Sequence, residues 1–193
     1  MFASIRGVRA TFMAIALAFC AVPTLAAAEE APSTVVSNLN AAALPLVNAK
    51  NNDATELGHV IQTHADIDNV LKRALGRKWK SLDAEQMAEL KAQTLTLVSK
   101  AYASAMEGVQ AADITYKAKG KREKSARVAT TVSKSTGSVQ VDYRLRLRAE
   151  GWKVVDVIIS GVSIVAVYSA DFEAVLAHKG VDGLIAALRE RNS

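Results

Sequence analysis

Side chains suited to metal, acid–base or nucleophilic chemistry are few in this chain and widely spaced. The three histidines are His59, His64 and His178. His59 and His64 are five positions apart, which places them roughly 140° apart around a helix, so they cannot chelate one ion. His178 falls near the end of a predicted helix, where a cation suits the helix dipole. The histidines therefore predict no metal site.

The serines and aspartates also give no catalytic pattern. Ser160 and Ser163 flank Gly161, but the Gly-x-Ser-x-Gly motif of a nucleophile elbow is absent. Asp142 and Asp156 are the remaining candidates for an acid–base pair. Asp142 falls on the polar face of a predicted strand, and Asp156 is isolated among apolar residues. We therefore expect no catalytic residue and a protein that is not an enzyme.

A run of basic residues is the most prominent charged feature, and it spans a predicted strand end and hairpin loop. It consists of Lys117, Lys119, Lys121, Arg122, Lys124 and Arg127. One interpretation is a solvated loop, and the other is a docking patch for anionic lipid headgroups or an acidic partner. The whole chain carries 24 Lys and Arg against 19 Asp and Glu, with 5% aromatic residues. This balance does not predict a nucleic-acid partner, since such proteins concentrate basic and stacking residues on one face.

The first 28 residues have the order of a secretory signal. Arg6 and Arg9 form a basic region, residues 12–21 are apolar but too few to span a bilayer, and three alanines end at Ala28. We expect cleavage after Ala28, or alternatively after Ala27, and export of a single domain over residues 29–193.

The single cysteine, Cys20, lies inside this segment. Acylation at Cys20 is a weaker alternative, because a lipoprotein signal needs a small residue where the chain has Phe19. Cleavage as predicted would leave no cysteine for a disulfide, a thiolate nucleophile or a metal site.

The remaining chain divides into a helical half and a strand half. A first helix is expected over residues 34–43, capped by Ser33 and ended by Pro45, and a second from Asp53 or Thr55 to His64. A third is expected over 69–75, capped by Asp66 or Asp68 and ended by Gly76. The fourth and longest is expected over 83–107. Asp83 and Gln86 match a capping box. Alternating apolar and polar residues predict strands over 114–119, 126–132, 139–147 and 152–159. Two helices follow, and the last begins at Gly180.

This segregation predicts an α+β fold in which helices cover a roughly four-stranded antiparallel sheet. The apolar residues of the strand over 139–147 have odd numbers, and they share one sheet face. Periodicity alone leaves open whether that face lines a filled core or an apolar cavity.

Two blocks of sequence form a recognisable pattern. The first block comprises residues 74–79 (ALGRKW), 83–86 (DAEQ) and 102–103 (YA). The second, more specific block comprises residues 151–157 (GWKVVDV), 161–163 (GVS) and 180–184 (GVDGL), followed by Leu188. Together the blocks resemble the MlaC-type family of periplasmic phospholipid-binding proteins. The chain departs from the family at Ser160, where an acidic residue is common, and it is short before the first block.

The resemblance implies a periplasmic carrier whose apolar cavity, enclosed by helices and an antiparallel sheet, holds acyl chains as cargo. Family members exchange lipid between an outer-membrane lipoprotein complex and an inner-membrane ABC transporter with an MCE-domain protein. No cofactor is implied, and a monomer suits a carrier. The shorter chain keeps a polycyclic, hopanoid-like lipid open as an alternative cargo. An envelope adaptor without lipid is the other alternative.

The residues expected to line the cavity combine apolar positions from the sheet, the long helix and the turn after residue 161. They are Leu97, Val98, Tyr102, Tyr116, Val128, Val141, Tyr143, Leu145, Val162, Ile164 and Val165. Trp79 and Trp152 are expected to serve as packing anchors. Gly161 is expected to supply either a backbone conformation or a close approach that a side chain would block.

Overall fold

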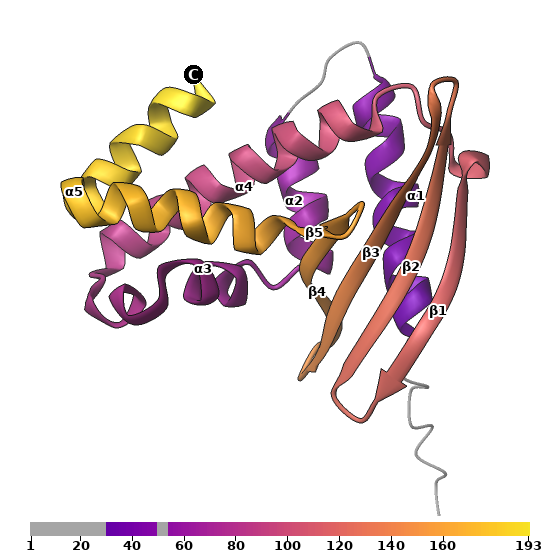
Figure 1. Cartoon of the computed structure of the whole chain (residues 1–193), viewed down its shortest axis with the longest axis horizontal. Coiled ribbons are helices and arrows are strands. Elements are labelled where there is room, and N and C mark those ends of the chain that lie inside the picture. Colours follow the sequence, from indigo (N-terminus) through magenta and orange to yellow (C-terminus); the bar gives the residue numbers. More distant parts are fainter. Residues whose placement is uncertain (1–29, 50–53) are drawn as a thin grey trace, which may run out of the picture.

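The computed structural model describes residues 30–49 and 54–193. The predicted signal segment, Cys20 and Asp53 lie outside the described residues. Four helices come first, a meandering sheet follows, and a long helix closes the chain (Figure 1). This order confirms the predicted α+β fold.

Two of the predicted caps in the helical half, those of the third and fourth helices, are confirmed. Its helices are α1 (Pro32–Asn48), α2 (Ala54–His64), α3 (Ile67–Leu75) and α4 (Ala84–Met106), with a 3₁₀ turn, η1 (Gly76–Ser81), after α3. Asp66 caps α3 by accepting a hydrogen bond from the Asn69 amide at 2.9 Å. Asp83 and Gln86 form both bonds of the capping box at the start of α4. The side chain of each cap satisfies an amide that has no partner within its helix.

The predicted bounds of the first helix are wrong at both ends. The helix begins at Pro32 rather than after a Ser33 cap, and the residue before it, Ala31, makes no side-chain capping bond. Proline is favourable there because the first helical amides have no intrahelical partner. At the other end, Pro45 lies inside the helix instead of ending it.

Tertiary contacts explain why α1 continues beyond Pro45. Val47, in the last turn, is only 5% exposed. The Asn48 side-chain nitrogen Nδ2 donates to the Val109 carbonyl oxygen at 2.9 Å. The Gly108 backbone amide donates to the Asn48 side-chain oxygen Oδ1 at 3.1 Å. These contacts stabilise the final turn against the local preference of proline.

The sheet is an antiparallel meander with its strands in chain order. It contains β1 (Ile114–Arg122), β2 (Ser125–Lys134), β3 (Gly137–Arg148), β4 (Gly151–Ile159) and the short β5 (Val162–Ser163). A 3₁₀ turn, η2 (Ala111–Asp113), precedes β1. The register shifts between Ala118 and Gly120 in β1, and again in β4 opposite Arg144 and Leu145. Four strands were expected from the sequence, and the two-residue β5 is the addition.

The two faces of the sheet differ in what covers them. We call the face that carries Val128, Val141, Tyr143 and Leu145 the inner face, because these residues belong to one buried hydrophobic cluster. Helix α1 packs against β1, β2 and β4, and in Figure 1 it lies behind the sheet. We call the opposite face, which carries Asp142 and the β3 arginines, the outer face.

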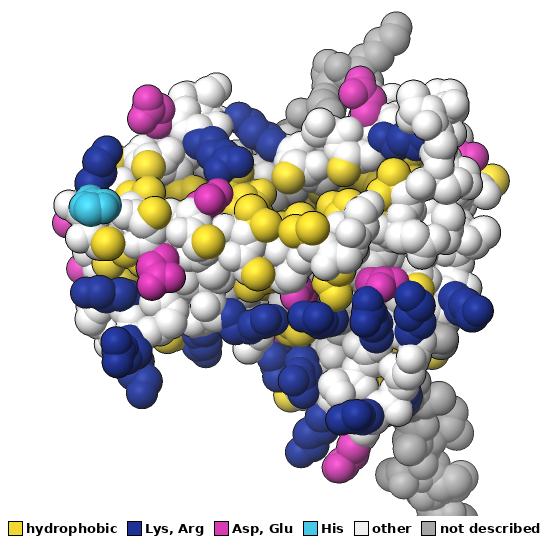
Figure 2. Space-filling model, in the orientation of Figure 1, with side chains coloured by type: hydrophobic (Ala, Val, Ile, Leu, Met, Phe, Trp, Pro, Cys, Tyr) yellow, Lys and Arg dark blue, Asp and Glu magenta, His cyan; other side chains and the backbone are white. Residues whose placement is uncertain are grey.

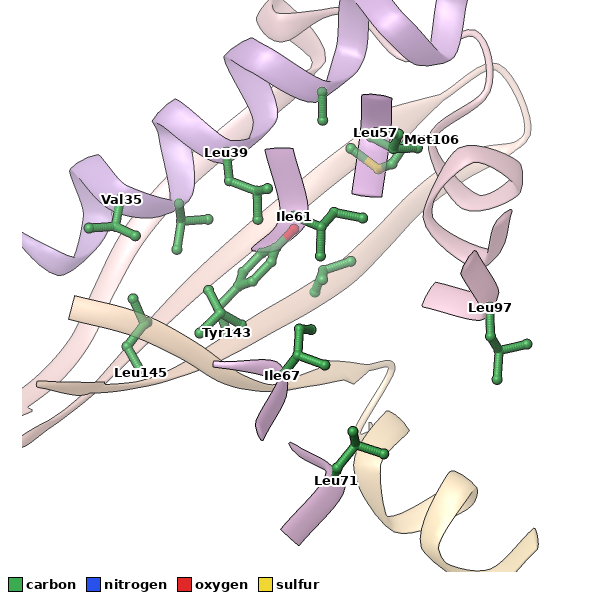
Figure 3. Close-up of a cluster of buried hydrophobic side chains, with 14 of the residues drawn as sticks. Val35, Leu39, Leu57, Ile61, Ile67, Leu71, Leu97, Met106, Tyr143 and Leu145 are labelled. Carbon is green, nitrogen blue, oxygen red and sulfur yellow. The ribbon is translucent and has the colours of Figure 1, made fainter. Parts of the chain in front are cut away.

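Helices α1 to α4, together with residues 172–188 near the C-terminus, contribute the other half of the inner-face cluster. Figure 3 shows Val35 and Leu39 of α1 and Ile61 of α2 facing Tyr143 and Leu145 from the sheet. All five side chains are buried. The cluster therefore lies between the sheet and the helices, where the sequence places either a core or a cavity.

Helix α5 (Ile164–Asn192) contains both of the expected closing helices. Gly180 interrupts it with non-helical angles (φ 66°, ψ −167°), and the chain changes direction there (Figure 1). Glycine tolerates this positive φ without steric cost. Within the described part of the chain, none of the helices is both long and apolar enough to cross a membrane.

Candidate functional site

Eight of the eleven residues expected to line a cavity converge at the inner face. Leu97, Val128, Val141, Tyr143 and Leu145 are buried members of the inner-face cluster, and Val98, Tyr102 and Tyr116 are partly buried and pack against it. They come from α4 and from three strands, so residues far apart in sequence share one apolar surface. Their contact with lipid stays a prediction.

The other three residues, in the segment after Gly161, lie outside the inner-face cluster. Val162 is 54% exposed, Ile164 is partly buried, and Val165 is buried in the first turn of α5. The chain reverses at Ser160 (φ 48°) and Gly161 (φ 88°), which directs these residues away from the inner face. A Cβ on Gly161 would meet no atom within 4 Å, so its backbone conformation, not a close approach, favours glycine.

A buried polar group lies within the apolar surroundings of the inner face. Asn40 of α1 is 1% exposed. Its side-chain nitrogen donates to the Tyr116 hydroxyl at 3.0 Å, and the Tyr102 hydroxyl donates to its side-chain oxygen at 2.8 Å. Sequence reasoning selected both tyrosines but missed Asn40. The available signal was its position four residues after Val36 and seven before Val47, on the buried face of α1.

Burial favours the neutral form of the Tyr102 and Tyr143 hydroxyls. Desolvation raises the pKa of Tyr102 well above its ordinary value, and the neighbouring Tyr143 and Tyr116 act in the same direction. Burial likewise raises the pKa of Tyr143, with a smaller contribution from Tyr116 and an opposing hydrogen bond from Asn40. The inner face thus offers hydroxyl donors and no charge, which is compatible with an apolar ligand.

The two candidate acid–base carboxylates lie on the outer face, where each is held by cations or other donors. Asp142 is 7% exposed and accepts from Arg127 Nε at 3.1 Å and from a second guanidinium nitrogen of Arg127. Lys119 Nζ is 3.6 Å from its other oxygen. These contacts link β1, β2 and β3 through one carboxylate. Asp142 therefore has a structural role.

The prediction that Asp156 is isolated is wrong. Asp156 is 2% exposed and pairs with Arg144 Nη1 at 3.1 Å. It also accepts from Ser163 Oγ at 2.8 Å and from the Val165 amide at 3.3 Å. The carboxylate therefore joins β3, β4 and the N-terminus of α5, where a negative charge is favoured by the helix dipole.

A basic groove of about 1120 Å³ opens between the outer face and α3. Nine Lys and Arg and no carboxylate line it: Arg73, Lys119, Lys121, Arg122, Lys124, Arg127, Arg144, Arg146 and Arg148. Figure 2 shows these charges as a band of Lys and Arg across the strands. The structure brings five of the six residues of the predicted basic run together with three arginines of β3.

Both tryptophans pack against the inner-face cluster, as anchors would. Trp152 is 2% exposed, and Lys121 Nζ lies 5.4 Å from the centroid of its ring. Trp79 is partly buried, and Lys72 Nζ lies 5.3 Å from its ring. Lys121 also lines the basic groove, so it connects the groove with the apolar cluster.

Comparison with known proteins agrees with this fold. A solved structure of a phospholipid-binding protein from Ralstonia solanacearum, in complex with a phospholipid, superposes with a TM-score of 0.70 and 24% sequence identity, covering 83% of this chain and 96% of that chain. No curated protein sequence matches. The family model described as MlaC protein matches residues 29–190. This match confirms the resemblance of the two sequence blocks, and the chain belongs to the MlaC family.

Proposed function

We propose that this protein binds phospholipid and carries it, with the acyl chains held between the inner face of the sheet and helices α1 to α4. Membership in the MlaC family supports a role in lipid binding. The likeness in fold to a phospholipid-binding protein solved with its lipid supports the same role.

The inner-face cluster is the observation that carries this proposal. Acyl chains gain roughly 0.8 kcal/mol for each methylene moved from water into apolar surroundings. A lipid with two chains needs on the order of 20 kcal/mol of such burial before it leaves a membrane. Residues of α4, β1, β2 and β3 provide a continuous apolar surface for it. The neutral group around Asn40 adds hydroxyl donors without the cost of a buried charge.

The finer role follows from the family and the N-terminal sequence. We propose a periplasmic carrier that exchanges phospholipid with an outer-membrane lipoprotein complex and with an inner-membrane ABC transporter bearing an MCE-domain protein. The carrier acts as a monomer and needs no cofactor, since its lipid is cargo. No step of this role requires a covalent reaction, only reversible burial of the chains.

Native mass spectrometry with lipid extraction tests the proposal. The protein is purified from the cell envelope without detergent, and a second sample is incubated with phospholipid vesicles. We expect a bound species of phospholipid mass in at least one sample. A polycyclic lipid mass would change the cargo class. A lipid-free mass in both samples would overturn the carrier proposal and leave an adaptor without cargo.

A further inference from the structure

The proposed burial of acyl chains makes no use of the positive charge of the basic groove, and this charge points to a second binding surface. We propose that the outer face docks on an anionic phospholipid membrane through this groove. The occupant is the headgroup layer of the membrane, distinct from the single lipid carried at the inner face.

Several cations of the groove have no salt-bridge partner within the described part of the chain, and two of them, Arg122 and Lys124, flank the exposed Glu123 in the β1–β2 hairpin. Lys119, Arg127 and Arg144 are each within 4 Å of an aspartate on the outer face. By contrast, the exposed Arg122 and Arg146, among the residues that the structure describes, have no carboxylate within 4 Å. Lys124, which lies two residues after Arg122 in the turn of the hairpin, also has no carboxylate within 4 Å among the described residues. Unpaired exposed cations of this kind attract an anionic surface.

The chemistry of the groove favours a membrane over an acidic protein. Interfaces between proteins depend on exposed apolar and aromatic side chains at their centres. The groove has no aromatic lining residue among those that the structure describes. Of its four apolar lining residues, Ala126, Leu145 and Val155 are at most 9% exposed and Leu147 is partly buried. A surface with many cations and little exposed apolar area suits a layer of phosphate headgroups, which requires charge but no fitted pocket.

Docking at the hairpin would also place the apolar site beside the membrane. Lys121 lines the groove and lies over the ring of Trp152, which belongs to the inner-face cluster. The hairpin is therefore where the charged and apolar surfaces meet. This consequence for lipid exchange rests on the proposed function, whereas docking itself does not.

Vesicle sedimentation with two matched triple variants tests the docking. The groove variant is Arg122→Gln, Lys124→Gln and Arg146→Gln. The control is Arg77→Gln, Lys78→Gln and Lys179→Gln, which removes the same charge from exposed residues outside the groove. Each protein is mixed at low salt with vesicles of phosphatidylglycerol in phosphatidylcholine, or of phosphatidylcholine alone. Thermal unfolding checks that both variants fold like the wild type.

We expect wild-type protein to bind only the vesicles that contain phosphatidylglycerol, and added salt to weaken that binding. Each cation at a membrane surface contributes about five-fold to binding, so the groove variant is expected to bind on the order of 100-fold more weakly. The control variant should remain within a few-fold of the wild type.

Three results would overturn the docking proposal. The first is no binding of wild-type protein to phosphatidylglycerol vesicles, which would leave an acidic protein as the partner. The second is equal binding to both kinds of vesicle, and the third is an equal loss in both triple variants. Bound phospholipid, measured by native mass spectrometry on the same samples, reports on the carrier function separately. Docking without any bound lipid would overturn the proposed function alone.

Discussion

The inner and outer faces of one sheet use opposite means to hold buried polar groups. Along β3, Val141, Tyr143 and Leu145 face the helices, while Asp142 and Arg144 lie between them on the outer face. The inner face satisfies its polar atoms with neutral hydrogen bonds to Asn40. The outer face satisfies Asp142 with cations.

This contrast is compatible with the proposed carriage of a lipid, because it keeps charged side chains off the inner face. A charge in contact with acyl chains would be strongly unfavourable unless paired, whereas a neutral hydroxyl with a partner is tolerated. Charges are instead placed on the other side of the strands, where the buried Asp142 is paired with cations and the exposed Arg144 and Arg146 reach water. We therefore expect polar substitutions on the inner face to lower both stability and lipid binding. On the outer face, we expect the loss of an ion pair to lower stability.

Placing a charge on the inner face should give the largest effect. In Val141→Asp, a carboxylate replaces a side chain that is 9% exposed within the inner-face cluster. We expect loss of bound phospholipid and a decrease in the free energy of unfolding of about 3 kcal/mol or more. Native mass spectrometry and urea denaturation measure the two quantities.

The matched control for this change is Gln140→Asp, one residue earlier and exposed. It introduces the same carboxylate on the outer side of β3, so lipid binding should persist and stability should change by less than about 0.5 kcal/mol. Equal losses in the two variants would show that the faces do not differ in the way described.

Removing a carboxylate from the outer face should give the next largest effect. Asp156→Ala removes the partner of Arg144, Ser163 and the Val165 amide at the start of α5. We expect a loss of about 2 kcal/mol, because the buried donors of this site would lose their acceptor. Urea denaturation measures the loss, and phospholipid binding should be retained.

Asp171→Ala provides the comparison for an exposed carboxylate. Asp171 lies 3.9 Å from Arg191, and both side chains are more than half exposed. Its removal should change stability by less than about 1 kcal/mol, as for other surface ion pairs. If Asp156→Ala cost no more than this control, Asp156 would have no structural role.

Local patterns predicted the faces of the sheet but not the group around Asn40. Alternation in β3 depends only on the strand period, so it can be recognised from neighbouring residues. The bonds of Asn40, by contrast, reach Tyr102 and Tyr116, which are 62 and 76 residues away. No local signal shows that these hydroxyls meet one amide.

The errors in prediction have the same origin. Pro45 predicted a helix end, but distant contacts of Val47 and Asn48 carry α1 beyond it. Val162 was expected in the lining as an apolar residue after the turn at residue 161, whereas the structure leaves it 54% exposed and outside the inner-face cluster. In each case, tertiary packing or chain direction overrides a preference read from a few neighbouring residues.

Alkaline pH should sharpen the comparison, because the tyrosines of the inner face ionise more readily in the unfolded protein than in the folded protein. An unfolded tyrosine has a pKa of about 10, and burial raises the pKa of Tyr102 and Tyr143 in the folded protein. The unfolded state therefore releases these protons first as the pH rises. The contribution of each tyrosine is fully present below about pH 10 and falls by about 1.4 kcal/mol per pH unit above it.

Urea denaturation between pH 9 and pH 11 measures this slope. Tyr143→Phe should reduce it by about 1.4 kcal/mol per pH unit, because phenylalanine has no proton to lose. Tyr168→Phe should reduce it less, since Tyr168 is only partly buried and Arg191 opposes the rise in its pKa. Equal slopes in the wild type and Tyr143→Phe would mean that alkaline destabilisation arises elsewhere, for example from lysines of the outer face that lose their charge. That result would remove the argument that the hydroxyls of the inner face are held neutral by burial.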